Sequence, residues 1–208
     1  MNVLGHTYVA VAATGRDDPE FLLGAVLPDL APMAGVRPDR AAAAGAVGEG
    51  IACHVATDAA FHGHPDFRAG MGALRRDLDG RGVGSGPARA VGHAGWELLL
   101  DGTLVASATL DAFGRALAAG EAALPALPAG DRPRWRAFLA RARTAPPPRY
   151  DDPAWVADRL HAMLARRPRL RLPADHVGTV AAALGDHQPG VEAAAAGVLA
   201  DTTRAVRG

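Results

Sequence analysis

Three ionisable residues spaced four apart stand out in the stretch GIACHVATDAAFHGHPDF, residues 50–67. In an α-helix, His54, Asp58 and His62 would lie along one side, because residues i, i+4 and i+8 share a face. Their neighbours are apolar and rich in alanine, where an unpartnered ionisable group is costly. The pattern therefore predicts either a hydrogen-bonded His-Asp chain that joins two helices or part of a metal site.

The stretch GHAGWELLLDG repeats this geometry, with His93, Glu97 and Asp101 spaced four apart beside a run of leucines. Two further candidates, His6 in GHT and Asp29 in LPDL, also stand next to apolar residues. Taken alone, a residue such as His6 is more often a structural histidine than a ligand. The pairing of imidazole and carboxylate on two helices makes metal ligation the favoured interpretation for His54 with Asp58 and for His93 with Glu97.

Mixed histidine and carboxylate ligands suit manganese, iron or zinc, and such metals hydrolyse phosphoesters. The candidate ligands for such a site are His6, Asp29, His54, Asp58, His93 and Glu97. Cys53 precedes His54 directly, so the two side chains diverge on a helix, and a cysteine nucleophile is disfavoured.

The elements that must position these residues are helices. Isoleucine occurs once, aromatic residues make up 5%, and no segment alternates apolar and polar residues over the length of a strand. We predict an all-α fold in a single domain, residues 1–208. Helices are expected at 3–13, 19–26 with a break at Pro28, 40–62, 65 to before 80, 87–100, 104–119, 131–143, 153–167, 174–186 and 190–205, with a connection over 121–130.

Composition narrows the class of protein. The 22 basic residues are all arginine and balance 22 acidic residues, so no net positive charge argues for nucleic acid or an anionic membrane. A single cysteine fits a reducing compartment, and no run of about 20 apolar residues suggests a membrane span. We expect a soluble cytoplasmic protein.

Several segments resemble the acyl carrier protein phosphodiesterases in order and spacing. These are MNVLGH with Ala10, LLGAVLPD, GIACHVATDAAFHGHPDFR, and later WVADRLHAMLARRPRLRL and LGDHQPGVE. The resemblance implies an HD-like helical bundle and a manganese-type hydrolase that removes 4′-phosphopantetheine from the serine of holo acyl carrier protein. It also implies that His6, Asp29, His54 and Asp58 occupy family positions, with Glu97 where the family has an aspartate. On this resemblance we expect these five residues to hold a divalent metal, most readily Mn²⁺, with Zn²⁺, Fe²⁺ or Mg²⁺ as alternatives.

The chain departs from the family at several positions near the site. Val55 and Ala56 stand where the family has two arginines, and Leu98 where it has a histidine. Phe61 and His62 replace a Thr-Asp pair, and His93 has no counterpart. Since lost basic residues weaken the case for an acidic protein substrate, we expect either a small phosphodiester or acyl carrier protein as substrate.

We therefore expect a metal-dependent phosphodiesterase in which either His62 or His93 donates a proton to the leaving oxygen. One alternative is a hydrolase similar to the zinc-dependent phospholipases C, whose helical members use spaced His and Asp residues. The other is a non-catalytic helical binding protein whose polar stripes are structural. The sequence does not predict which residues bind the substrate, how many metals are bound or which oligomeric state forms.

Overall fold

The computed structural model describes residues 1–39 and 41–208, and every regular element in these residues is a helix. The prediction of an all-α fold is confirmed, since the described residues contain no strand. Spatial contacts divide the chain into two compact units, each assembled from separated segments. Unit 1 comprises Met1, 61–105 and 148–200, and unit 2 comprises 2–60, 106–147 and 201–208.

Unit 2 is organised around α2 (Pro19–Ala34), which packs against α1 (Val3–Thr14), α6 (Ala108–Ala118) and α7 (Arg132–Thr144). The helix α2 begins with Asp18 as its N-cap, whose side chain accepts a hydrogen bond from the Phe21 amide. Phe21 and every residue from there to Leu27 are buried, so α2 is apolar around nearly its whole circumference. This central helix fixes the positions of the elements that carry His6 and His54.

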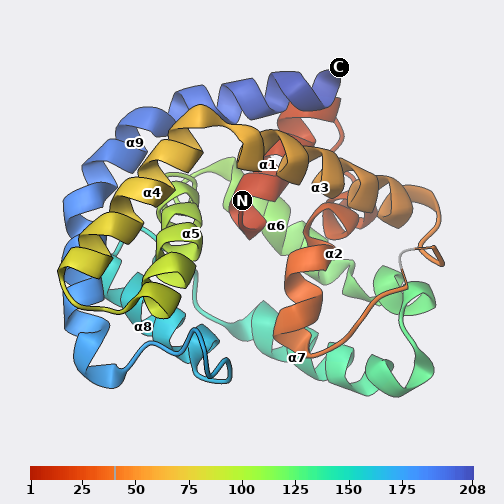
Figure 1. Cartoon of the computed structure of the whole chain (residues 1–208). Helices are drawn as coiled ribbons and strands as arrows, with labels where there is room; N and C mark the ends of the chain where they lie inside the picture. The colour runs from red at the N-terminus through yellow and green to blue at the C-terminus, as the bar shows by residue number, and fades with distance from the viewer. Residues whose placement is uncertain (40) are drawn as a thin grey trace. The chain divides into compact units, whose positions relative to one another are not determined.

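Unit 1 contains α4 (Pro65–Gly80), α5 (Ser85–Gly102), α8 (Pro153–Leu164) and most of α9 (Val177–Arg207). α4 and α5 run side by side, and α5 also packs against α8 (Figure 1). At Gly95 of α5, a methyl group would lie 2.9 Å from Leu184 of α9 and 3.6 Å from Leu160 of α8. The absence of a side chain at Gly95 thus lets three helices meet closely.

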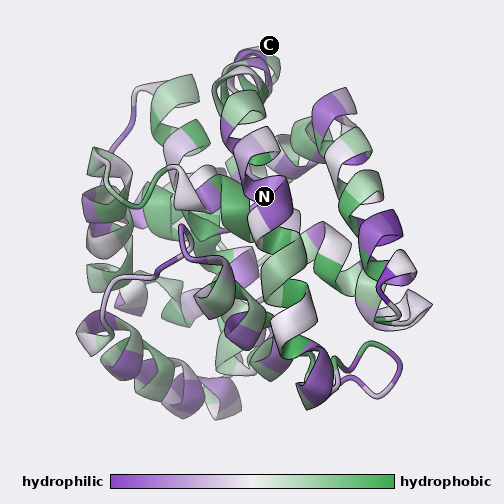
Figure 2. Ribbon diagram, turned by 90° about the vertical axis from the view of Figure 1, so that its left-hand side faces the viewer, coloured by the Kyte–Doolittle hydropathy of each residue, from purple (hydrophilic) through white to green (hydrophobic). Residues whose placement is uncertain are grey.

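The helix α3 (Gly45–Gly63) carries residues of both units, since the division falls between Ala60 and Phe61. Its expected start at residue 40 lies outside the described residues. Hydrophilic and apolar residues alternate around the turns of individual helices (Figure 2). None of the helices within the described residues is both long enough and apolar enough to cross a membrane.

The prediction that the second helix ends before Pro28 is wrong, because α2 continues through Pro28 and Pro32 to Ala34. Each proline removes one helical N–H donor, but the helix is held by its buried side chains on both sides of Pro28. Tertiary packing therefore outweighs the local preference of proline to end a helix.

The prediction of two C-terminal helices, 174–186 and 190–205, is also wrong. A short 3₁₀ helix, Ala174–His176, leads into the single helix α9, which passes through Pro189 and is bent along its length in Figure 1. Buried residues lie on both sides of Pro189, including Val180, Leu184 and Val198. The expected connection over 121–130 contains two 3₁₀ helices, Gly120–Ala126 and Ala129–Asp131, and the helix expected from 104 begins at Ala108.

Candidate metal centre

A close crossing of α2 and α3 positions the first group of ligand-type residues. A methyl group on Gly24 would lie 2.2 Å from the Val47 carbonyl oxygen, and one on Gly50 would lie 2.1 Å from the Phe21 carbonyl oxygen. Neither position tolerates a β-carbon, so the two backbones touch. His54 follows Gly50 by one turn of α3, and this turn brings its ring against the backbone of α2.

His54 is held in one orientation by that contact. Its Nδ1 lies 2.9 Å from the carbonyl oxygen of Ala25, which can only accept, so Nδ1 carries the proton and donates. The other nitrogen, Nε2, lies 3.3 Å from Oδ2 of Asp58 on the next turn. A histidine whose Nδ1 is tied to a backbone carbonyl presents the lone pair of Nε2, which is the usual arrangement of a metal-ligating imidazole.

His6 of α1 completes this group. Its ring stacks on that of His54, with centroids 3.9 Å apart, and its Nε2 lies 3.2 Å from Oδ1 of Asp58 and 3.7 Å from Oδ2 of Asp29. His6 is buried, and its Nδ1 makes no hydrogen bond to any residue that the structure describes. A buried imidazole nitrogen without a hydrogen bond is costly in a structural role, because it has lost water without compensation.

The electrostatics of the two imidazoles differ. Burial is the main cause that lowers the pKa of His6 from 6.5 to about 4, so its ring is neutral at pH 7. Burial also opposes the charge on His54, but its interactions with Asp58 and Asp29 outweigh that effect and raise the pKa of His54 above its ordinary value. The two carboxylates are partly exposed, 38% for Asp58 and 25% for Asp29, so solvent reaches this side of the group.

A second group of the same composition lies in unit 1. Nε2 of His93 is 3.1 Å from Oε1 of Glu97, one turn further along α5, and Nε2 of His62 is 3.8 Å from the same oxygen. The rings of His62 and His93 stack with centroids 5.0 Å apart. The Met1 ammonium also lies 2.8 Å from Oε1 of Glu97.

Glu97 is a strongly ionised carboxylate. Burial opposes its charge, but His93 and the Met1 ammonium outweigh that effect and lower the pKa of Glu97 to about 2. Phe67 and Trp96 pack beside these residues, with ring centroids 5.3 Å apart. The two imidazoles and the Met1 ammonium are therefore the partners of a carboxylate that stays charged at any physiological pH.

Both groups fit a divalent metal. In each, three ligand atoms lie within 4.8 Å of one another, one group being His6, His54 and Asp58 and the other His62, His93 and Glu97. Atoms that bind one ion at about 2.0–2.2 Å lie up to about 4.4 Å apart, so small side-chain movements suffice. The donors are imidazole nitrogens and carboxylate oxygens, a set that suits manganese, iron or zinc.

The structure thus brings together three of the five residues expected to hold metal, with Asp29 beside His6. It groups the fifth, Glu97, with His62 and His93, which we had expected to act as acids. Asp101, on the same stripe of α5, is fully buried and belongs to neither group. His64 is the N-cap of α4, where its Nδ1 accepts a hydrogen bond from the Asp66 amide.

The residues that orient these side chains were not predicted from the sequence. The Ala25 carbonyl carries no signal in its side chain, and Gly24 and Gly50 were not singled out among 25 glycines. The signal that existed was the position of Gly50 one turn before His54 in a predicted helix, where a glycine favours close approach of another backbone. Cys53 is buried, and burial raises the pKa of its thiol, which fits its exclusion as a nucleophile.

The fold and these groups define an all-helical protein with two sets of histidine and carboxylate side chains that could each hold a metal ion. Comparisons with protein families, with curated proteins and with solved structures found no match to this chain. Its function is therefore inferred from the residues of the site.

Proposed function

We propose that the protein is a metal-dependent hydrolase of phosphodiesters that binds a divalent metal, most readily Mn²⁺, through His6, His54 and Asp58. The observation that supports the proposal most directly is His6, a buried and neutral imidazole whose Nε2 lies beside the carboxylates of Asp58 and Asp29 and whose Nδ1 lacks a hydrogen bond among the described residues. A structural His-Asp chain would use both nitrogens, whereas a ligand must keep one lone pair available.

Each residue of the site would have its own role in metal binding. Ala25 holds the tautomer of His54 that leaves Nε2 available, and Asp58 presents one oxygen to each imidazole. Asp29 adds a second carboxylate close to His6. A bound divalent metal would supply a Lewis acid that lowers the pKa of water and offsets charge on a phosphoryl oxygen.

The group in unit 1 supports the proposal independently. Its two imidazoles are partly exposed, 37% for His62 and 44% for His93, so both can exchange a proton with a bound reactant. With Glu97 they also form a ligand set of their own. We propose that His62 and His93 transfer protons to a reactant bound in unit 1, and the resemblance to acyl carrier protein phosphodiesterases supports the phosphodiester class. We also propose a cytoplasmic location, because the single cysteine, Cys53, is free, as is usual in a reducing compartment.

Elemental analysis coupled to a substrate panel tests the proposal. The purified protein should contain a transition metal at about one ion per chain or more, and Mn²⁺ should support hydrolysis of bis(p-nitrophenyl) phosphate. Asp58→Asn should lose both properties, whereas Asp111→Asn, an exposed aspartate of α6 outside both groups, should keep them. The panel includes phosphatidylcholine, so a phospholipase C activity is detected in the same assay. A metal-free protein that hydrolyses none of these esters with any added metal contradicts the proposal.

A further inference from the structure

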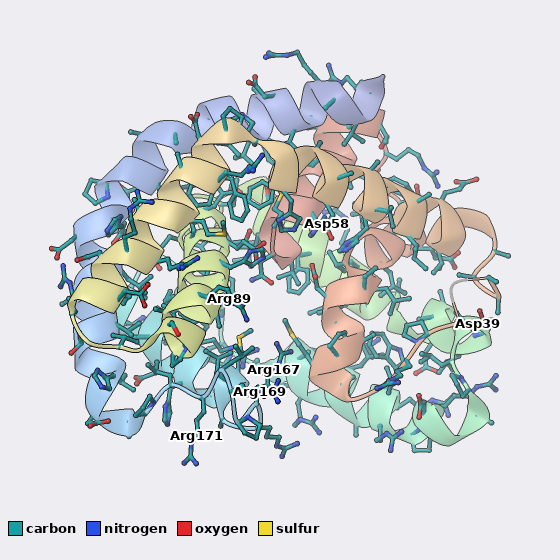
Figure 3. The ribbon with its side chains drawn as sticks, viewed as in Figure 1. Asp39, Asp58, Arg89, Arg167, Arg169 and Arg171 are labelled. Carbon is teal, nitrogen blue, oxygen red and sulfur yellow. The ribbon has the colours of Figure 1, made fainter. Side chains whose placement is uncertain are left out.

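A basic pocket of about 500 Å³ lies in unit 1, lined by Arg89, Arg167, Pro168, Arg169 and Leu170. Three of its five lining residues are arginines and none is acidic. Figure 3 shows Arg89 on α5 and Arg167 and Arg169 on the segment that follows α8. Within residues 1–39 and 41–208, the side chains of these three arginines make no hydrogen bond or ion pair. Their charges are therefore available to a ligand.

Backbone contacts build this pocket and hold it in place. A methyl group on Gly86, in the first turn of α5, would lie 2.3 Å from the carbonyl oxygen of Arg169, so the two segments approach closely only because this residue is glycine. The Arg167 amide donates to the Leu164 carbonyl, and the Leu170 amide donates to the Arg167 carbonyl. These bonds shape the turn that presents Arg167 and Arg169.

A side-chain bond secures the far end of the same segment. Nδ1 of His161 on α8 donates to the carbonyl oxygen of Leu172, 2.9 Å away, and Leu172 is itself fully buried. The segment that carries two of the arginines is therefore fixed to the unit at both ends. A rigid site loses little conformational entropy when a ligand binds, so binding costs less free energy.

One helix, α5, carries residues of both the pocket and the ligand group of unit 1. Arg89, His93 and Glu97 are four residues apart on α5, so their side chains leave the same face of the helix. The guanidinium of Arg89 thus belongs to the turn that precedes His93. A phosphate held by Arg89 would therefore lie on the side of α5 that carries His93.

We propose that Arg89, Arg167 and Arg169 form a binding site for a phosphate group of a small-molecule substrate. The planar guanidinium offers paired N–H donors that match phosphate oxygens, and three such groups without acidic neighbours favour a dianion. That this phosphate belongs to the substrate rests on the proposed function, whereas binding of the anion itself rests on the pocket alone.

Calorimetric titration of the metal-free protein with inorganic phosphate tests the site, because chelation removes any phosphate bound to metal. The wild type should bind phosphate, and binding should weaken as sodium chloride is raised. Arg89→Gln and Arg169→Gln should each weaken it about tenfold or more. Arg171→Gln removes an exposed arginine of the same segment that does not line the pocket, and it should bind as the wild type does.

Kinetics separate this inference from the proposed function. For a phosphodiester that also carries a phosphate monoester, Arg89→Gln should raise KM about tenfold or more, while Arg171→Gln should keep the KM of the wild type. Asp58→Asn should abolish hydrolysis yet still bind inorganic phosphate. If wild type does not bind phosphate, or if Arg89→Gln and Arg169→Gln bind it as the wild type does, the site is not where we place it. Phosphate binding without hydrolysis of any ester would overturn the proposed function and leave the pocket assigned.

Discussion

The imidazole rings of His6 and His54 lie stacked with centroids 3.9 Å apart, and the two oxygens of Asp58 approach one Nε2 each. His54 has a second partner in the Ala25 carbonyl, whereas Nδ1 of His6 makes no hydrogen bond to any described residue. Two buried imidazoles that share one carboxylate in this way are better arranged to bind a cation than to satisfy each other.

The first prediction concerns Asp58→Asn. If the group binds metal, this change should remove metal binding and activity while the metal-free protein loses little stability, because clustered carboxylates repel each other when no cation is bound. If the group is purely structural, the same change removes a buried charge partner and should cost about 1–3 kcal/mol whether or not metal is supplied.

Melting curves of wild type and Asp58→Asn, each with chelator and with added Mn²⁺ or Zn²⁺, separate the two cases. On the metal interpretation, added metal raises the Tm of the wild type only. The metal centre is left without support if added metal does not change the Tm of the wild type and the variant melts markedly lower under every condition.

The second prediction is a pH dependence in the metal-free protein. The pKa of His6 is about 4 when folded and 6.5 in an unfolded chain. Below pH 6.5 the unfolded chain therefore binds a proton that the folded protein does not, so stability falls as the pH falls towards 4. The difference corresponds to about 3 kcal/mol, present in full above pH 6.5.

His54 acts in the opposite direction, because its raised pKa contributes stability that is lost as the pH rises through it. The measurement is therefore the difference between wild type and His6→Gln. Free energies of unfolding from urea titrations between pH 4 and 7 should fall less steeply for the variant. Equal slopes for both proteins would show that His6 titrates normally.

The amphipathic helical pattern predicted much of this fold. The starts of α4 at Pro65 and α8 at Pro153 followed from proline in the first turn, and both are confirmed. The failures at Pro28 and Pro189 have one cause, since in both places buried residues continue on either side of the proline. Local preference is visible in a sequence, but the packing that overrides it is not.

The candidate site was predictable to a similar degree. Helical spacing alone predicted the pairs His54–Asp58 and His93–Glu97. The approach of His6 from α1 and the hydrogen bond from His54 to Ala25 depend on how α1, α2 and α3 pack, and no spacing within one helix contains that information. The arginine pocket depends in the same way on Gly86 and the Arg169 carbonyl, which are far apart in the chain.

The third prediction concerns the substrate. Val55 and Ala56 are exposed on α3, next to the ligand His54, where the resembling family has two arginines. An acidic carrier protein would find no basic side chain at these positions, so holo acyl carrier protein should be a poor substrate compared with a small phosphodiester. A direct assay of released 4′-phosphopantetheine checks this, and efficient release would show that the protein substrate is recognised by other residues.

The last prediction tests whether the α2–α3 crossing orients His54. In Gly50→Ala the added methyl group would lie 2.1 Å from the Phe21 carbonyl, a backbone atom that cannot move alone, so α3 must shift away from α2. Overpacking of this kind costs about 1–3 kcal/mol, and the shift should also break the bond from His54 to Ala25.

The matched control is Gly63→Ala, which changes the last residue of the same helix, where an added methyl group meets nothing within 4 Å. We expect Gly63→Ala to keep the stability and metal affinity of the wild type, and Gly50→Ala to lose metal affinity by about 10-fold or more because a displaced supporting partner weakens a ligand. Measuring metal affinity well below the Tm of each variant separates the local effect from unfolding. If Gly50→Ala folds, melts lower and still binds metal as tightly as Gly63→Ala, then the crossing stabilises the fold without orienting His54.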